Sequence, residues 1–129
     1  MAVFTDAEVA YLATQRLARL ATASTAGEPD VSAVGFGIDG DAIVSGGMDI
    51  TKTVRYRHLL ENPRATIVID DLASIEPWSP RGIKVRGHAD LEDDNGRLRI
   101  RISPEVIWSW GINADQEKRF ASIERRTVA

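Results

Sequence analysis

Residues 82–102 read GIKVRGHADLEDDNGRLRIRI, and the alternation of apolar and polar residues in this stretch decides the fold. Both halves place an apolar or small side chain at every second position, namely Ile83, Val85, Gly87, Ala89 and Leu91, then Leu98, Ile100 and Ile102. A period of two is typical of strands with one buried face. Asp94-Asn95-Gly96 lies between the halves and is a strong turn signal. The stretch therefore predicts two antiparallel strands joined by a tight hairpin.

The N-terminal half carries three more strand-like segments. RLARLATAST (residues 16–25) and PDVSAVGFGI (29–38) are rich in small and β-forming residues, and Ala26-Gly27 predicts a turn between them. Asp39-Gly40 predicts a second hairpin, with DAIVSGG (41–47) as the returning strand. We therefore expect these segments to form a three-stranded meander.

Two helices are predicted outside this meander. The capping-box pattern from Thr5 to Glu8 predicts a helix over residues 6–13. Tyr56, Leu59 and Leu60 recur at helical spacing, so they should share one buried face of a second helix that Pro63 ends.

The remaining segments complete a β protein. ATIVID (65–70) reads as a central strand, and PEVIWSWGI (104–112) as a separate last strand after Pro104. We expect a mainly β fold with a few helices, in which six or seven mostly antiparallel strands form a barrel or a sandwich. The chain, 1–129, should be one domain, with a charged tail over 115–129 that is loose or helical.

The composition excludes several classes of function. The net charge of −3 argues against a nucleic-acid partner, and the absence of cysteine excludes disulfides and thiolate metal sites. No apolar run is long enough to span a membrane, and the N-terminus does not resemble a secretory signal. We therefore expect a soluble, cytoplasmic protein.

No self-contained catalytic group stands out. The two histidines, His58 and His88, have no metal-ligand spacing, so we expect no metal site and assign no catalytic residue. Trp78 lies in the turn-like EPWSPRG (76–82), where a ligand or interface role and plain packing are equally favoured.

The best candidate site is the basic start of the mid-chain helix, DITKTVRYR (49–57). If Asp49 or Thr51 caps the helix, its first turn presents free amides and the positive end of the dipole, with Lys52, Thr53 and Arg55 beside them. This combination favours an anion, most naturally a phosphate. The competing interpretation is a solvated polar helix surface.

Four segments together make the chain resemble the pyridoxamine-phosphate-oxidase-like split β-barrel superfamily, also described as FMN-binding split barrels. They are RLATASTAGEPDVSAVGF, DAIVSGG, TKTVRYRHLLENPRATIVID and IKVRGHADL with the closing EVIWSWGI. The most specific piece, from Lys52 to Arg64, matches K-[TS]-x-x-x-x-x-L-x-x-[ND]-P-R. The short length and the SWG ending resemble the actinobacterial branch that uses the deazaflavin coenzyme F420.

The resemblance implies a homodimer with two cofactor sites at the subunit interface. It implies that Lys52 and Thr53 hold the cofactor phosphate and that Trp78 lines the substrate side. Along the cofactor ring and linker it places residues of three strands: Ser32, Ala33 and Val34, then Val44 and Ser45, then Ile67, Val68 and Ile69.

The resemblance also implies a reaction, with alternatives. Reduced F420 would pass a hydride to a small electron-poor acceptor, which makes the protein an oxidoreductase. One alternative is FMN as cofactor in the same fold; another is a carrier or sensor that binds a cofactor or a tetrapyrrole without turnover. Oxidation of pyridoxamine phosphate itself is disfavoured, because the C-terminal pattern that holds its phosphate is missing from this sequence.

Overall fold

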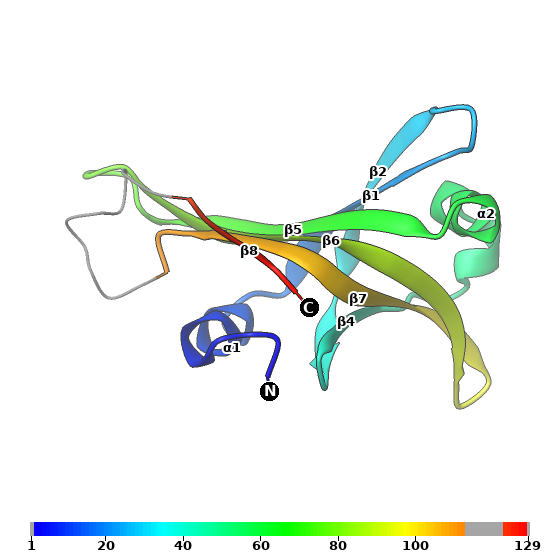
Figure 1. The fold of residues 1–129 in the computed structure, drawn as a ribbon, viewed down its shortest axis with the longest axis horizontal. Coiled ribbons are helices and arrows are strands. Elements are labelled where there is room, and N and C mark those ends of the chain that lie inside the picture. Colours follow the sequence, from blue (N-terminus) through cyan, green and yellow to red (C-terminus); the bar gives the residue numbers. More distant parts are fainter. Residues whose placement is uncertain (1, 113–122, 129) are drawn as a thin grey trace.

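The computed structural model describes residues 2–112 and 123–128. Figure 1 shows a long, curved sheet with one helix at its right end and the other below the sheet. The elements in chain order are α1 (Asp6–Leu12), β1 (Leu17–Ala23), β2 (Pro29–Gly35), β3 (Gly37–Asp39), β4 (Ala42–Ser45), the 3-10 turn η1 (Ile50–Lys52), α2 (Val54–Glu61), β5 (Arg64–Ser74), β6 (Ser79–Asp94), β7 (Arg97–Trp110) and β8 (Glu124–Thr127).

The sheet is antiparallel throughout and runs in the order β2-β1-β5-β6-β7-β4-β3, with β8 added to β7. β2 and β3 therefore lie at opposite edges, although only Phe36 separates them along the chain. The sheet must curl until both edges meet at Phe36. The prediction of a mainly β, antiparallel barrel is confirmed, but the described residues contain eight strands instead of the expected six or seven.

The predicted three-stranded meander is wrong. β1 pairs with β2 and β3 pairs with β4, as the two turn signals indicated, but β2 does not continue into β3. The chain breaks at Phe36, which has a glycine on each side and packs against the core. Phe36 is therefore not part of either strand, and its side chain packs against the core where β2 ends and β3 begins.

The β6–β7 hairpin forms as predicted. Asn95 and Gly96 both have positive φ values, 52° and 88°, as a two-residue hairpin of type I′ requires. The separate last strand predicted after Pro104 is wrong, because β7 continues through this proline. A bulge in the β6–β7 pairing beside Gly87 accommodates Pro104. Only glycine fits at position 87, because a Cβ there would lie 2.0 Å from Ser103 O.

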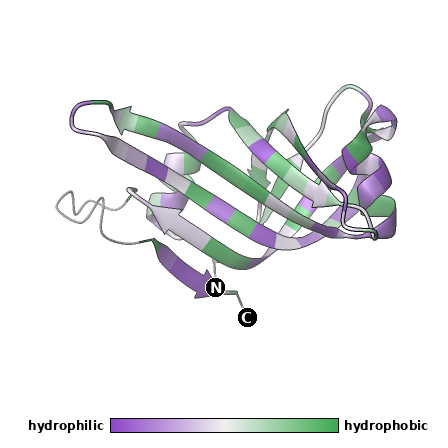
Figure 2. Ribbon diagram, turned by 90° about the horizontal axis from the view of Figure 1, so that it is seen from above, coloured by the Kyte–Doolittle hydropathy of each residue, from purple (hydrophilic) through white to green (hydrophobic). Residues whose placement is uncertain are grey.

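The core lies inside the curl of the sheet, where the alternating residues of the central strands meet. Figure 2 shows the resulting hydrophobic and hydrophilic bands along the strands. The fully buried side chains include Leu20, Ile43, Ile67, Ile69, Ile83, Val85, Ile100 and Ile102. Burying one such side chain stabilises a fold by about 1.5–3 kcal/mol.

Both helices form where predicted, with one difference. The capping box of α1 is present: Glu8 N donates to Thr5 Oγ1 at 3.1 Å, and Thr5 N donates to Glu8 Oε1 at 2.9 Å. In α2, Leu59 is buried as expected, but Leu60 is 61% exposed. His58 is buried instead and lies 2.9 Å from the Thr22 hydroxyl of β1, so α2 is rotated relative to the predicted face.

The expectation of a loose or helical tail is wrong for its last part. Residues 113–122 lie outside the described residues, but β8 pairs with β7 along the edge that β4 leaves open. Arg126 of β8 donates to Glu8 Oε2 at 2.8 Å and to Val3 O at 2.6 Å. Because Glu8 is only 1% exposed, Arg126 neutralises a carboxylate that water does not reach.

A second polar network joins α1 to the sheet. Asp71 of β5 accepts hydrogen bonds from Tyr11 Oη at 2.9 Å, Gln15 Nε2 at 3.1 Å and Arg81 Nε at 2.7 Å. The Arg81 bond is the main reason that the pKa of Asp71 falls to about 2. Burial and the bond to Asp71 raise the pKa of Tyr11.

Replacing Arg126 should destabilise the fold strongly. Arg126→Met leaves the Glu8 carboxylate buried without a cation, which should lower the free energy of unfolding by about 3 kcal/mol. Urea denaturation of the purified variant measures this change. Arg64→Met is the matched control, since its pair with Glu105 is about half exposed and should contribute less than about 1 kcal/mol. Equal effects of the two substitutions would contradict the assignment.

Stability should also fall in acid because of Asp71. Its folded pKa of about 2 lies below the value of about 3.9 for an unfolded chain. Its contribution is therefore complete above pH 4 and is lost as the pH falls from about 4 towards 2. Asp71→Asn should flatten the dependence of unfolding free energy on pH in this window, measured by urea denaturation. Asp41→Asn, at an exposed position, should leave that slope unchanged.

Candidate functional site

The start of α2 is set by two separate caps. Asp49 caps the 3-10 turn, because its Oδ1 accepts from Thr51 N at 3.1 Å and Thr51 Oγ1 at 2.5 Å. These two bonds lower the pKa of Asp49. Thr53 caps α2 in place of the expected Asp49 or Thr51: its Oγ1 accepts from Tyr56 N at 3.2 Å and donates to Ile50 O at 2.6 Å. The only hydroxyl hydrogen of Thr53 is thus already used.

The first turn of α2 has backbone N–H groups that can donate hydrogen bonds to a ligand. A helix leaves its first amides without partners inside the helix, and the Thr53 hydroxyl satisfies only that of Tyr56. The amides of Val54 and Arg55 remain at the positive end of the dipole. Lys52 is exposed immediately before this turn. Two amides and an ammonium group therefore occupy one small region of the surface.

Arg55 adds an observation that points to a ligand. Its Nε is buried and has no hydrogen-bond partner, which is true of no other buried side-chain nitrogen or oxygen among the described residues. Its Nη2 lies 3.6 Å from the position that a Cβ on Gly47 would occupy, so the guanidinium lies against the Gly46-Gly47 turn that follows β4. Native proteins rarely leave a buried donor unpaired. An anion at this place would supply the missing acceptor.

A cleft of about 360 Å³ runs along the same glycine turn. It is lined by residues from both edges of the sheet and from the β6–β7 hairpin: Gly35, Phe36, Gly37, Val44, Gly46, Gly47, Asp94, Arg97, Leu98 and Arg99. A Cβ on Gly35 would meet nothing within 4 Å, and one on Gly37 or Gly46 would make only ordinary contact. The part of the wall that these glycines form is therefore backbone, which a flat group can approach closely.

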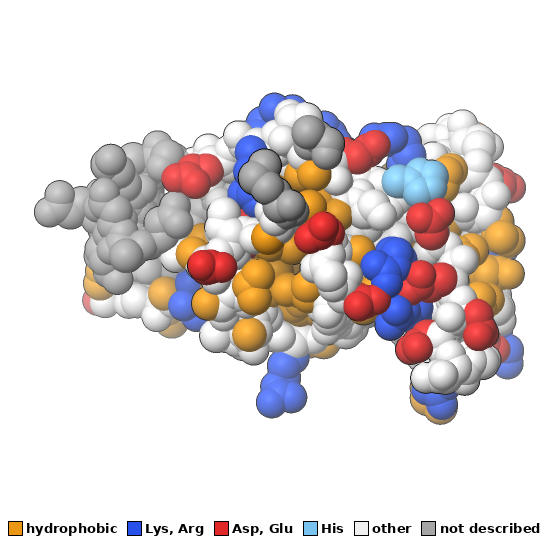
Figure 3. All heavy atoms as spheres, turned by 60° about the horizontal axis from the view of Figure 1, so that its bottom comes forward, with side chains coloured by type: hydrophobic (Ala, Val, Ile, Leu, Met, Phe, Trp, Pro, Cys, Tyr) orange, Lys and Arg blue, Asp and Glu red, His pale blue; other side chains and the backbone are white. Residues whose placement is uncertain are grey.

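Among the described residues, some arginines at the mouth of this cleft are paired with carboxylates, and one is not. Arg99 is held by Glu92 and Asp39, and Arg101 by the same two carboxylates. Both arginines lower the pKa of Glu92 through hydrogen bonds, Arg101 more strongly. Figure 3 shows acidic and basic side chains interleaved at the end of the molecule away from the grey residues. Arg97, by contrast, is exposed and forms no ion pair within the described residues.

Of the residues in β2 and β4 that we expected to contact the cofactor, only one lines the cleft. Val44 lines the cleft. Ser45 is 2% exposed, and its Oγ donates to Gly35 O at 2.7 Å, so it fixes β4 to β2 and does not face a ligand. Val34 is buried, Ser32 is half-buried and Ala33 is exposed.

The expected residues of β5 divide by alternation. The side chains of Ile67 and Ile69 are completely buried in the core, so they cannot contact a ligand on the surface. Val68 faces the opposite way. The strand register places it beside Arg19 of β1, which in turn lies beside Ala33 of β2. Only Val68 of the three can belong to an external site.

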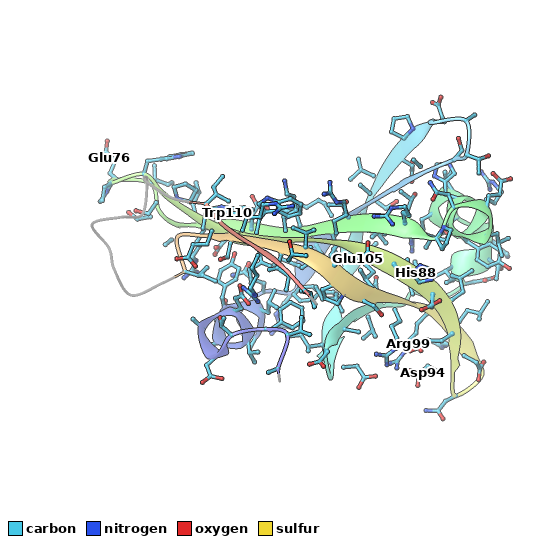
Figure 4. All side chains as sticks on the ribbon, in the orientation of Figure 1. Glu76, His88, Asp94, Arg99, Glu105 and Trp110 are labelled. Atoms are coloured by element: carbon cyan, nitrogen blue, oxygen red, sulfur yellow. The ribbon has the colours of Figure 1, made fainter. Side chains whose placement is uncertain are left out.

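Trp78 is not brought to the cleft within one chain. It is 55% exposed in the turn before β6, whereas the cleft lies at the far end of β6, beside Asp94 and Arg99. Figure 4 shows Glu76 near one end of the molecule and both of these residues near the other. A strand of this length spans on the order of 50 Å. Trp78 can therefore reach such a site only from a second copy.

Sequence reasoning missed the cleft residues of the β6–β7 hairpin, above all Arg97 and Leu98. The alternation places these residues on the two faces of a strand, and nothing in it indicates that this hairpin lies beside β4. The glycine pairs were the available signal, because glycines flanking Phe36 and following Ser45 indicate close approach of backbone.

The described residues contain neither a metal-binding group nor a membrane-spanning helix. Over 2–112 and 123–128, no group of three or more histidine or acidic side chains is arranged to hold a metal ion. Neither α1 nor α2 has the length and apolar character that crossing a membrane requires.

Comparison with solved structures identifies the fold. The chain is similar to the conserved hypothetical protein Rv2991 from Mycobacterium tuberculosis, with a TM-score of 0.71, 18% identity and coverage of 85% of this chain and 86% of the other. It is equally similar to a heme-binding protein from Mycobacterium smegmatis, with a TM-score of 0.71 and 20% identity, over 96% of this chain and 58% of the other. At these identities the likeness concerns the fold alone.

Comparison of sequences identifies the family. The chain is 34% identical over 122 residues to the 5a,11a-dehydrotetracycline/5a,11a-dehydrooxytetracycline reductase of Streptomyces rimosus subsp. rimosus, covering 87% of this chain and 86% of the relative. The family model for pyridoxamine 5'-phosphate oxidase matches residues 4–124. The curled antiparallel sheet, the family match and this relative agree, and the chain belongs to the pyridoxamine 5'-phosphate oxidase family, whose fold is the split β-barrel.

Proposed function

We propose that this protein is an oxidoreductase that uses a flavin-type coenzyme, F420 rather than FMN, to reduce an electron-poor double bond in a small organic substrate. The similarity to a reductase over most of both chains supports the reaction class. Such a coenzyme supplies the hydride when it is bound, and this explains why the sequence contains no recognisable acid–base or nucleophile pair. The protein's own part is to hold, orient and shield the reactants.

The unpartnered Nε of Arg55 is the observation that carries this proposal. A phosphate oxygen there would accept from Arg55, while the first amides of α2 and the ammonium group of Lys52 would hold the other oxygens. Thr53 positions this site by capping the helix and does not hold the phosphate with its hydroxyl. The residues present therefore fit a phosphorylated coenzyme.

The cleft beside Gly46 and Gly47 fits the flat part of such a coenzyme. The glycine backbone in its wall allows close approach, and the half-buried Phe36 and Val44 keep part of it apolar. Ser45 holds the β4 end against Gly35 and so fixes the width of this wall. Exclusion of water by apolar side chains protects a transferable hydride and strengthens nearby charge interactions.

The proposed site also needs a second copy of the chain, so we propose a homodimer. The outer face of β1 and β2 exposes Leu17 and Val31, at 59% and 66%, and these two side chains lie on the same face as Ala33 and Val68. Contiguous apolar side chains on an open sheet face are typical of interaction surfaces. A partner on this face would bring its own Trp78 within reach of the coenzyme.

Replacing Lys52 should weaken coenzyme binding without unfolding the protein. Lys52→Ala removes one charge-assisted contact, worth roughly 1.5–3 kcal/mol, so F420 should bind about 10- to 100-fold more weakly in a fluorescence titration. Arg57→Ala is the matched control, since Arg57 is exposed on the same helix. Equal affinity of Lys52→Ala and wild type for F420 would rule out the proposed phosphate site at the start of α2.

The same titration with F420 and FMN side by side decides the coenzyme. Tighter binding of FMN than of F420 would replace F420 in the proposal. Turnover is then followed as oxidation of reduced F420 in the presence of a quinone acceptor. Tight binding without oxidation of the coenzyme would make the protein a carrier.

The dimer proposal has its own test. Wild-type protein should sediment at twice the mass of the chain, and Val31→Asp should shift it towards the monomer, because the substitution places a charge in the apolar face. Leu60→Asp, at a similarly exposed position on α2, should leave the dimer intact. A wild-type monomer in sedimentation velocity at micromolar concentration would exclude the shared site.

A further inference from the structure

A cleft of about 390 Å³, which we call the α1 cleft, lies between α1 and β3. Figure 1 shows α1 below the sheet, on the same side as β4. The lining comes from α1, the loop that follows it and the segment around β3, namely Val9, Leu12, Ala13, Gln15, Phe36, Gly37 and Ile38. None of these side chains is charged, and the volume lies within the range of roughly 300–1,000 Å³ that is typical of small-molecule sites.

The α1 cleft is open because α1 does not cover the whole inner face of β3. Ile38 is the partner of Ile43 in the β3–β4 ladder, and directly opposite residues share one face of a sheet. Ile43 is completely buried, whereas Ile38 remains 36% exposed. Across the gap, Val9 of α1 is 44% exposed. A ligand in the cleft therefore meets aliphatic side chains on both walls.

Polar contacts at both ends of α1 keep this gap from closing. Arg126 of β8 donates to Glu8 at 2.8 Å near the start of the helix. Near its end, Tyr11 and Gln15 donate to Asp71 of β5 at 2.9 and 3.1 Å. Neither β5 nor β8 pairs with β3, so these contacts hold α1 against other parts of the sheet. The α1 cleft is therefore preformed, and a ligand need not displace the helix.

Among the described residues that line the cleft, Gln15 alone has a polar side chain. Its Nε2 donates to Asp71 Oδ2 at 3.1 Å and to Thr14 Oγ1 at 3.0 Å, which uses both hydrogens of the amide. Its Oε1 is an acceptor that forms no hydrogen bond with a described residue. The cleft therefore suits an uncharged, largely apolar molecule that donates one hydrogen bond.

The α1 cleft adjoins the cleft beside Gly46 and Gly47, where we place the flat part of the coenzyme. Phe36 and Gly37 line both clefts. A Cβ on Gly37 would meet only Val44 Cγ2, at 3.8 Å, so glycine at this position leaves space beside the coenzyme cleft. Hydride transfer requires the donor and acceptor atoms to lie about 3–3.5 Å apart. A substrate must therefore bind next to the coenzyme, and the α1 cleft is next to it.

The α1 cleft is distinct from the face that we assign to a second copy. That face belongs to β1, β2 and β5, where Leu17, Val31 and Val68 lie on the outside of the sheet. The lining of the α1 cleft includes no residue of β1, β2, β5 or β6. The dimer contact that we propose therefore uses other residues.

We propose that the α1 cleft binds the substrate, an uncharged molecule with several rings and a hydroxyl group, whose reacting double bond lies beside Phe36 and Gly37. This inference rests on the proposed function and identifies the class of its substrate. The acceptor takes up a hydride from the reduced coenzyme and one proton from water. Val9 and Ile38 determine the specificity, because a charged substrate would lose its hydration against their aliphatic side chains without gaining a partner.

The compound 1-naphthol tests this assignment, because it is an uncharged ring system with a hydroxyl group and the coenzyme does not reduce it. Its matched probe is 1-naphthalenesulfonate, which has the same rings and a negative charge. In calorimetric titrations of the protein saturated with oxidised F420, 1-naphthol should bind about tenfold more tightly than the sulfonate, or better. Both ligands should be held at once, so 1-naphthol should leave the affinity for F420 unchanged.

Two substitutions fill the α1 cleft without touching the coenzyme site. Ile38→Trp and Val9→Trp each place an indole ring in the cleft, so both should weaken 1-naphthol binding by about tenfold or more with unchanged affinity for F420. They act from β3 and from α1, so a local folding defect in one variant leaves the other as the test. Leu60→Trp is the control, since Leu60 is 61% exposed on α2, and it should change neither affinity.

Turnover separates this inference from the proposed function. With reduced F420 and menadione, a quinone acceptor, both cleft variants should raise the KM for menadione by about tenfold. Oxidation of reduced F420 with an unchanged KM in both variants would keep the proposed function and overturn the substrate cleft. Displacement of F420 by 1-naphthol, or equal affinity for 1-naphthol and its sulfonate, would also overturn it. Wild type that binds 1-naphthol as expected but oxidises no reduced F420 would overturn the proposed function and would support the α1 cleft as a binding site.

Discussion

The architecture depends on one short connection. β2 and β3 are opposite edges of the sheet, yet only Phe36 separates them along the chain. An open, flat sheet cannot satisfy this connection, so the sheet curls and places its core on the inside. The Ser45 hydroxyl then fixes the end of β4 to Gly35 O. The cleft beside Phe36 exists because two strand edges meet there without a continuous ladder between them.

Charge pairing divides the cations of this protein into two kinds. Arg19, Arg64, Arg81, Arg99, Arg101 and Arg126 are each held by a carboxylate. These pairs fix strands and helices to one another, and the buried Glu8–Arg126 pair joins the two ends of the described chain. Of the cations without such a partner among the described residues, some lie at the start of α2 and some around Trp108, and Arg97 lies beside the cleft. A protein with a net charge of −3 can still bind an anion locally, where a cation has no carboxylate partner.

The correct predictions from the sequence came mainly from local patterns. Alternation and the Asn95-Gly96 turn predicted the β6–β7 hairpin, and the capping box predicted α1, because each depends on residues that are close along the chain. The failures depend on distant contacts. Nothing in RLRIRISPEV shows that Gly87 lies opposite Pro104 and lets the strand continue, and nothing in the charged tail shows that Arg126 reaches Glu8.

The same distinction explains which parts of the candidate sites were predictable. Lys52 and Arg55 lie within four residues of each other, so helix geometry alone indicated an anion site there. The α1 cleft takes its lining from α1 and from the segment around β3, and its existence depends on contacts that hold α1 to β5 and β8. A shift of one residue in the β3–β4 register would also turn Ile38 away from the cleft. The accessible apolar surface between α1 and β3 is thus a product of distant contacts, and only a folded chain reveals it.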